Sequence, residues 1–82
     1  MTEQVVSVLT SLESRPAALF VQTASKFSSD IHVRIDSKTV NAKSIMGIIS
    51  LGIMDGQDVT LAAEGEDEKQ AVSELKKLLT SK

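Results

Sequence analysis

The chain has 82 residues, 41% of them hydrophobic, and a formal net charge of −2, which suits one small domain with a packed core. It has no cysteine, which excludes a disulfide framework and a thiolate nucleophile. The slightly acidic balance argues against nucleic-acid binding, and no apolar run resembles a signal peptide or a membrane span. We therefore expect a single domain over residues 1–82 of a soluble, cytoplasmic protein that binds neither nucleic acid nor membrane.

The first part of the chain changes from a strand pattern to a helix pattern. In residues 3–9, Val6 and Val8 share one face, which predicts a strand. Residues 15–27 have the period of a helix instead. Its apolar stripe consists of Ala17, Phe20, Val21, Ala24 and Phe27. Pro16 fits the first turn, where backbone N–H groups have no partner within the helix.

The middle of the chain predicts a hairpin and a short helix. Residues 30–36 alternate between apolar and polar side chains, which predicts a strand. One face of it holds Ile31, Val33 and Ile35, and the other holds His32 and Arg34. A tight turn at residues 37–38 leads into a short strand over residues 39–42. The helix that follows has Ser44 as its N-cap and Gly52 near its end. Its buried side is expected to hold Ile48 and Leu51.

The last third predicts a turn, a strand and a helix. Asp55-Gly56 is a turn signal, and residues 58–63 are rich in residues that favour strands. The final helix opens at Asp67, and Gln70 follows at the spacing of a capping box. Its apolar stripe consists of Ala71, Val72, Leu75, Leu78 and Leu79.

The order of elements is therefore β-α-β-β-α-β-α, which is an α+β arrangement. The short connection between the second and third strands predicts an antiparallel hairpin. Each helix has one apolar side, so we expect the helices to cover one face of a single sheet. His32 and Arg34 then lie on the open, solvated face. A lone histidine in mid-strand is far more often a surface residue than a catalytic group, and by itself it makes no metal site.

Three strings of residues resemble HPr, the histidine phosphocarrier of the bacterial sugar phosphotransferase system. They are RPAALFVQTASKF (residues 15–27), NAKSIMGIISLG (residues 41–52) and AAEGEDE (residues 62–68). They occur in the family's order and spacing, so the resemblance covers essentially the whole chain. It implies the family's open-faced β-sandwich, in which a four-stranded antiparallel sheet is covered on one face by three helices.

The stretch before the first helix departs from the HPr signature at one position. The family carries Gly-Ile/Leu-His-x-Arg-Pro-Ala, whereas residues 11–17 read SLESRPA, with Glu13 where the phosphorylated histidine stands. Glu13 is either a favourable charge beside a helix start, worth about 0.3–1 kcal/mol, or a permanent negative charge that imitates phosphohistidine. An acyl phosphate is the route by which Glu13 would itself carry a phosphoryl group.

Ser44 has the sharpest functional expectation. As an N-cap, its hydroxyl accepts a hydrogen bond from the first turn, worth about 1 kcal/mol. The resemblance implies a second role, because the matching serine of HPr from low-GC Gram-positive bacteria is phosphorylated by HPr kinase/phosphorylase. Ile45, Met46 and Ile49 lie around it, and they either join the core or form an exposed apolar patch. Arg15 is expected near the starts of both the first and the second helix, where it recognises an anion of a partner.

An HPr-like chain with the serine string but without the carrier histidine most resembles the catabolite-repression subgroup of the family, the Crh-like proteins. That resemblance implies a regulatory phosphoprotein that is switched at Ser44, is not an enzyme and needs no cofactor or metal. Its partner would be catabolite control protein A, for which it acts as corepressor in carbon catabolite repression. Two alternatives stay open: a phosphocarrier that uses Glu13, and an HPr-fold binding module with an unrelated partner.

Overall fold

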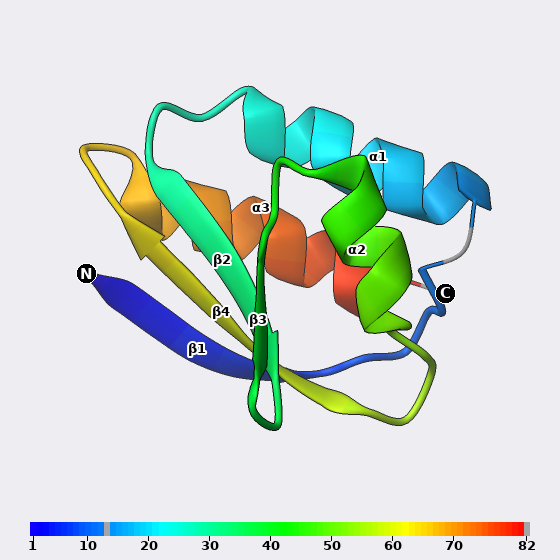
Figure 1. The fold of residues 1–82 in the computed structure, drawn as a ribbon. Helices are drawn as coiled ribbons and strands as arrows, with labels where there is room; N and C mark the ends of the chain where they lie inside the picture. The colour runs from blue at the N-terminus through cyan, green and yellow to red at the C-terminus, as the bar shows by residue number, and fades with distance from the viewer. Residues whose placement is uncertain (13, 82) are drawn as a thin grey trace.

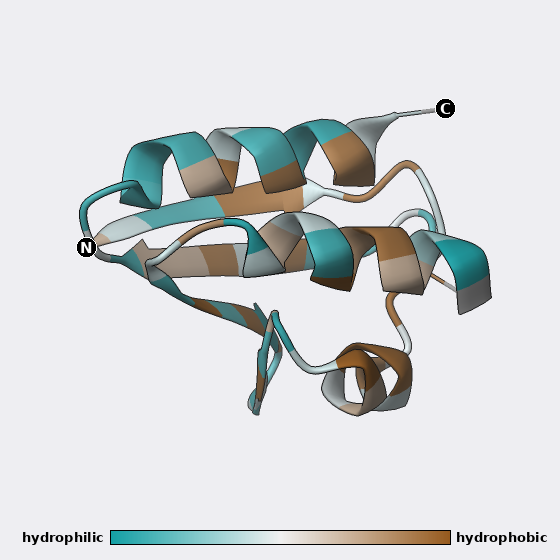
Figure 2. Cartoon of the chain, turned by 90° about the horizontal axis from the view of Figure 1, so that it is seen from above, coloured by the Kyte–Doolittle hydropathy of each residue, from teal (hydrophilic) through white to brown (hydrophobic). Residues whose placement is uncertain are grey.

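The computed structural model describes residues 1–12 and 14–81. Within them lie β1 (Thr2–Ser7), α1 (Ser14–Ser25), β2 (Asp30–Ile35), β3 (Lys38–Asn41), α2 (Ile45–Leu51), β4 (Asp58–Glu64) and α3 (Glu68–Thr80) (Figure 1). The strands form one antiparallel sheet in the order β1-β4-β2-β3. The three helices lie on one side of it, with α1 and α3 side by side and running in opposite directions (Figures 1 and 2). The predicted fold class is confirmed.

The sheet has one apolar face and one solvated face, because buried and exposed side chains alternate along its strands. In β2, Ile31 and Val33 are buried, whereas His32 and Arg34 are exposed on the open face. The predicted alternation is therefore confirmed for this strand. The first strand is shorter than residues 3–9, because its pairing with β4 ends at Ser7.

One core fills the space between the sheet and the helices. From the predicted helix stripes, the side chains of Ala17, Phe20, Ala24, Ala71, Val72, Leu75 and Leu79 are buried, and those of Val21, Phe27 and Leu78 are partly buried. α1 ends at Ser25, before the predicted end at Phe27. Phe27 still packs against the core, since its N–H reaches back to the Ala24 carbonyl at 3.2 Å in a tightened last turn. No helix in the described ranges is long and apolar enough to cross a membrane.

The turn of the β2–β3 hairpin lies one residue earlier than predicted. Lys38 already pairs with Ile35, which places the turn at Asp36 and Ser37 rather than at residues 37–38. Asp36 adopts a φ of 54°, in the left-handed region that aspartate tolerates better than most residues. The preference of Asp36 for this backbone conformation explains the shift.

The capping box predicted at Asp67 and Gln70 is wrong. Asp67 precedes α3, but its side chain makes no hydrogen bond to the helix. Its carboxylate instead accepts from the N–H groups of Ser28 (2.9 Å) and Ser29 (3.0 Å), and from the Ser29 hydroxyl. The hydrogen bond from the Ser29 side chain is the main cause that holds the pKa of Asp67 below its ordinary value. Asp67 therefore ties the start of α3 to the loop between α1 and β2.

Glu68, rather than Gln70, accepts a hydrogen bond from a backbone N–H that precedes the helix. Its Oε1 accepts from the N–H of Gly65 at 3.2 Å, and its other oxygen accepts from the Thr2 hydroxyl. The bond from Thr2 is the first cause that lowers the pKa of Glu68. Gly65 has a φ of 153°, and a Cβ there would lie 2.9 Å from the Cβ of Ser29, so only glycine fits this approach. The start of α3 is thus joined to β1 through Glu68 and to the loop between α1 and β2 through Asp67.

Candidate functional site

Ser44 lies at the head of α2, as predicted. Its backbone is extended (φ −107°, ψ 112°), and its Oγ accepts a hydrogen bond from the N–H of Gly47 at 3.1 Å. The Ser44 carbonyl accepts from the N–H of Ile48 at 3.0 Å, which is the first bond of the helix. At the other end, Gly52 adopts the left-handed conformation of a C-cap, and its N–H donates to Ile49. Both predicted caps of α2 are confirmed.

The Ser44 hydroxyl accepts from the helix but donates no hydrogen bond within the described residues. Ser44 is half-buried, so part of the residue stays open to solvent. Gly47 keeps the space beside it open: a Cβ at Gly47 would lie 3.3 Å from Ser44 Oγ and 3.2 Å from the Cβ of Val40. The Ser44 oxygen is therefore held in place by its own helix and has no side chain at Gly47 to crowd it.

An exposed apolar surface surrounds Ser44. Ile45, Met46 and Ile49 are 37%, 73% and 49% exposed, and we call these three residues the α2 patch. Ile48 and Leu51, on the other side of the same helix, are buried as predicted. Figure 2 shows α2 nearly end-on, with brown segments around much of its circumference. A helix this short cannot bury apolar residues on all sides, which leaves these three side chains exposed to solvent.

Lys43 holds the loop before Ser44, a role that the sequence analysis missed. Its Nζ donates to the carbonyl of Phe27 at 2.8 Å, and its backbone N–H donates to Oδ1 of Asn41 at 2.8 Å. The first bond joins the start of α2 to the chain just after α1. The Asn41 turn is a local signal that the sequence displays, but the contact with Phe27 depends on the tertiary fold.

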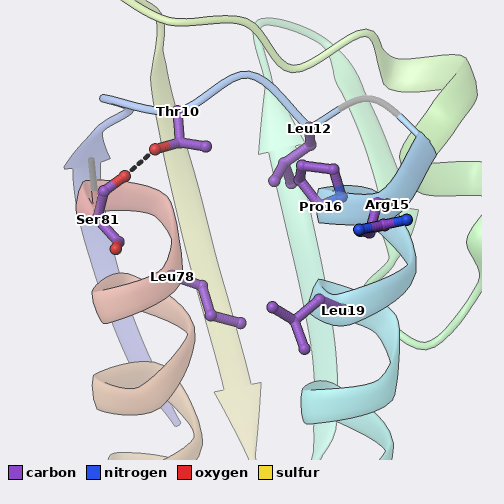
Figure 3. A pocket seen from close by; sticks show the side chains of 7 residues that line it. All are labelled: Thr10, Leu12, Arg15, Pro16, Leu19, Leu78 and Ser81. Atoms are coloured by element: carbon purple, nitrogen blue, oxygen red, sulfur yellow. Dashed lines mark hydrogen bonds between the residues drawn. The ribbon is translucent and has the colours of Figure 1, made fainter.

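Arg15 is exposed on the first turn of α1, as predicted, and stands in the wall of a pocket between α1 and the end of α3 (Figure 3). No residue of α2 lines this pocket. Within residues 1–12 and 14–81, no hydrogen bond or ion pair joins Arg15 to Ser44 or to an acidic side chain. The structure therefore places Ser44 beside the α2 patch, and it places Arg15 in the wall of this pocket.

Of the two other residues that the sequence analysis singled out, only His32 lies within the described residues. His32 is exposed on the open face of the sheet, beside a hollow of about 150 Å³ that Asp30 and Glu64 also line. In the part of the chain that the structure describes, no group of three or more His, Cys, Asp or Glu residues is placed to hold a metal ion. Glu13, predicted at the phosphohistidine position, lies outside the described residues.

The whole chain is similar to proteins of known family. The family described as "PTS HPr component phosphorylation site" matches residues 2–81. This chain belongs to the HPr family. The HPr-like protein Crh of Bacillus subtilis (strain 168) is 53% identical to it over 77 residues, which cover 92% of this chain and 91% of that protein.

Solved HPr structures share the fold of this HPr-family chain. HPr-C-His from Thermoanaerobacter tengcongensis superposes with a TM-score of 0.91 at 57% identity, covering 96% of this chain and 91% of that one. The phosphocarrier protein HPr from Bacillus anthracis superposes with a TM-score of 0.92 at 46% identity, covering 96% of each chain. The open sheet and its three helices are therefore those of HPr.

Proposed function

We propose that this HPr-family protein is a regulatory phosphoprotein, switched at Ser44 by HPr kinase/phosphorylase in the cytoplasm. In its phosphorylated form it acts as corepressor of catabolite control protein A in carbon catabolite repression, without catalysis or a cofactor and without contacting nucleic acid or membrane itself. The observation that carries the proposal is the position of Ser44 Oγ beside the exposed α2 patch. The similarity to proteins named Crh and the glutamate at position 13 support it.

Phosphorylation changes the surface around Ser44 far more than the fold. A phosphate adds about −1.5 to −2 charges and three strong acceptor oxygens, which moves the net charge from −2 to roughly −4. It stands next to Met46, which is 73% exposed. An Arg or Lys of the partner can then bind the phosphate while an apolar surface covers the α2 patch. Such a charge-assisted contact is worth about 1.5–3 kcal/mol, or roughly 10- to 150-fold in affinity.

Arg15 is proposed as a second contact of the same partner. Arg15 is exposed and has no ion pair among the described residues, so we expect its removal to cost little stability. Arg15→Ala should therefore leave the melting temperature nearly unchanged and weaken partner binding. A large fall in melting temperature with unchanged binding would assign Arg15 to the scaffold.

The first experiment is incubation of the protein with HPr kinase/phosphorylase and ATP, followed by intact mass spectrometry and site mapping. We expect one phosphoryl group on Ser44 and none on the Ser44→Ala variant. Ser50 is a matched control, because it is an exposed serine on the same helix, and Ser50→Ala should be labelled normally. Labelling elsewhere, or none at all, contradicts the proposed switch.

The second experiment titrates the phosphorylated and the unphosphorylated protein against catabolite control protein A. We expect the phosphorylated form to bind at least about tenfold more tightly, and Ser44→Asp to imitate it poorly because a carboxylate has less charge and fewer oxygens. Equal affinities would refute the corepressor role even if Ser44 is phosphorylated, and would favour an unrelated partner. Phosphoryl transfer from phosphoenolpyruvate to Glu13 of the wild-type protein would favour the phosphocarrier instead.

A further inference from the structure

The pocket beside Arg15 combines a mostly apolar lining with one charged side chain among the described residues. It lies between the first turns of α1 and the last turn of α3, and its volume is about 340 Å³. We call it the α1–α3 pocket. Its lining residues are Thr10, Leu12, Arg15, Pro16, Leu19, Leu78 and Ser81. The volume lies within the range of small-molecule sites in proteins, about 300–1,000 Å³.

Hydrogen bonds from the chain between β1 and α1 hold this pocket in shape. The N–H of Leu9 donates to the Leu79 carbonyl at 2.7 Å, and the Thr10 hydroxyl donates to the Ser81 carbonyl (Figure 3). The N–H of Leu12 donates to the Ile53 carbonyl at 2.9 Å. A ligand would therefore find the pocket already formed, which lowers the entropic cost of binding.

The described residues that line the pocket are mostly apolar, and one of them is charged. Leu19 and Leu78 point toward one another from α1 and α3, with Leu12 and Pro16 at one end (Figure 3). Leu19 is 50% exposed, although it is a large aliphatic side chain on a helix that packs on the core. Arg15 is the only ionisable residue among the described residues of the lining. The pocket thus offers an apolar slot with one cation beside it.

We propose that the α1–α3 pocket binds a small carboxylic acid with an aliphatic body. The aliphatic part lies between Leu19 and Leu78, and the carboxylate accepts hydrogen bonds from the Arg15 guanidinium, which suits planar, bidentate pairing. A sugar fits poorly, because the Thr10 hydroxyl is already engaged and the remaining lining is mostly apolar. A dianion fits less well than a monoanion, since Arg15 is the one cationic side chain among the described lining residues. The site is separate from Ser44 and does not require the proposed switch.

A series of ligands tests the proposal on the wild-type protein by two-dimensional NMR titration. Hexanoate carries both features, hexan-1-ol has the aliphatic body without the charge, and acetate has the charge without the body. We expect hexanoate to bind with a Kd on the order of 1 mM and to shift the amides of Leu12, Leu19 and Leu78. Hexan-1-ol should bind roughly fivefold more weakly, because it forgoes the charge-assisted bonds, and acetate should not saturate. Hexyl phosphate should bind no more tightly than hexanoate.

Paired variants test the two halves of the site. Arg15→Gln should reduce hexanoate binding to the level of hexan-1-ol, whereas Arg34→Gln, which removes an exposed arginine on the open sheet face, should change nothing. Leu19→Ser should weaken both ligands at least about fivefold, whereas Val5→Ser, which removes an exposed aliphatic side chain on the open face, should weaken neither.

Several results would overturn the proposal. They are the absence of saturable shifts with hexanoate, equal affinity for hexanoate and hexan-1-ol, and shifts centred on the α2 patch. Tighter binding of hexyl phosphate by tenfold or more would make the pocket a phosphate site instead. None of these measurements uses the kinase or the repressor, so failure here and failure of the Ser44 switch are told apart.

Discussion

Ile48 and Ile49 are neighbours on α2, but one is buried and the other is exposed. Replacing each of them with alanine therefore distinguishes a role in stability from the proposed role in partner binding. Ile48 is fully buried and Ile49 is 49% exposed. A helix as short as α2 does not form by itself, so its stability comes from packing of its buried side on the core. Ile48→Ala should therefore destabilise the protein, and Ile49→Ala should not.

The size of the effect follows from burial. Ile48→Ala removes three carbon atoms, each worth about 0.8 kcal/mol on burial, and the cavity that remains raises the total loss to about 2–5 kcal/mol. In a domain of this size each kcal/mol lowers the melting temperature by roughly 4–8 °C, so we expect a fall of at least about 8 °C. Ile49→Ala should change stability by less than about 1 kcal/mol, because alanine favours helix and the lost side chain is half exposed.

Thermal and urea unfolding followed by circular dichroism measures both variants. The slope of the urea transition should stay constant, which shows that the native and unfolded states are otherwise unchanged. Binding of catabolite control protein A by the phosphorylated variants supplies the second readout, and Ile49→Ala should weaken it while remaining folded. Equal losses of stability in the two variants, or a larger loss for Ile49→Ala, would refute the division of α2 into a buried and an exposed side.

Three further predictions concern other sites. Gly47→Ala should slow labelling of Ser44 by the kinase in a timed mass-spectrometric assay, because the new Cβ would lie 3.3 Å from Ser44 Oγ, while circular dichroism shows α2 retained. Folding lowers the pKa of Glu68 and of Asp67 below their ordinary values of 4.5 and 3.8, so stability should fall as pH drops from these values toward the lower values of the folded protein. Asp67→Asn should flatten this slope in acid titration. Glu13→His should accept a phosphoryl group from phosphoenolpyruvate through the general phosphotransferase enzyme in a labelling assay, and an unlabelled variant would mean that more than the imidazole is missing.

Much of the fold could be predicted because its signals are local or periodic. The alternation in residues 30–36 identified β2 and its open face, and the helical stripes identified the core sides of α1 and α3. Ser44 and Gly52 marked the ends of α2, since a cap depends on the residue and its own helix alone. These features need only the chain itself over one or two turns.

The tertiary structure decided which partner a polar side chain chooses and which residues share a pocket. Asp67 was predicted to cap its own helix, yet it accepts from Ser28 and Ser29, which only folding brings within reach. Arg15 lines a pocket closed by Leu78 of α3, a neighbour far along the chain that no local pattern indicated. A short-range pattern shows which hydrogen bonds a side chain is able to make within its own helix. The groups that folding packs against that side chain compete for it, and they decide which partner it takes. The sequence alone therefore determined the elements and the Ser44 cap, and packing determined the contacts of Asp67 and Arg15.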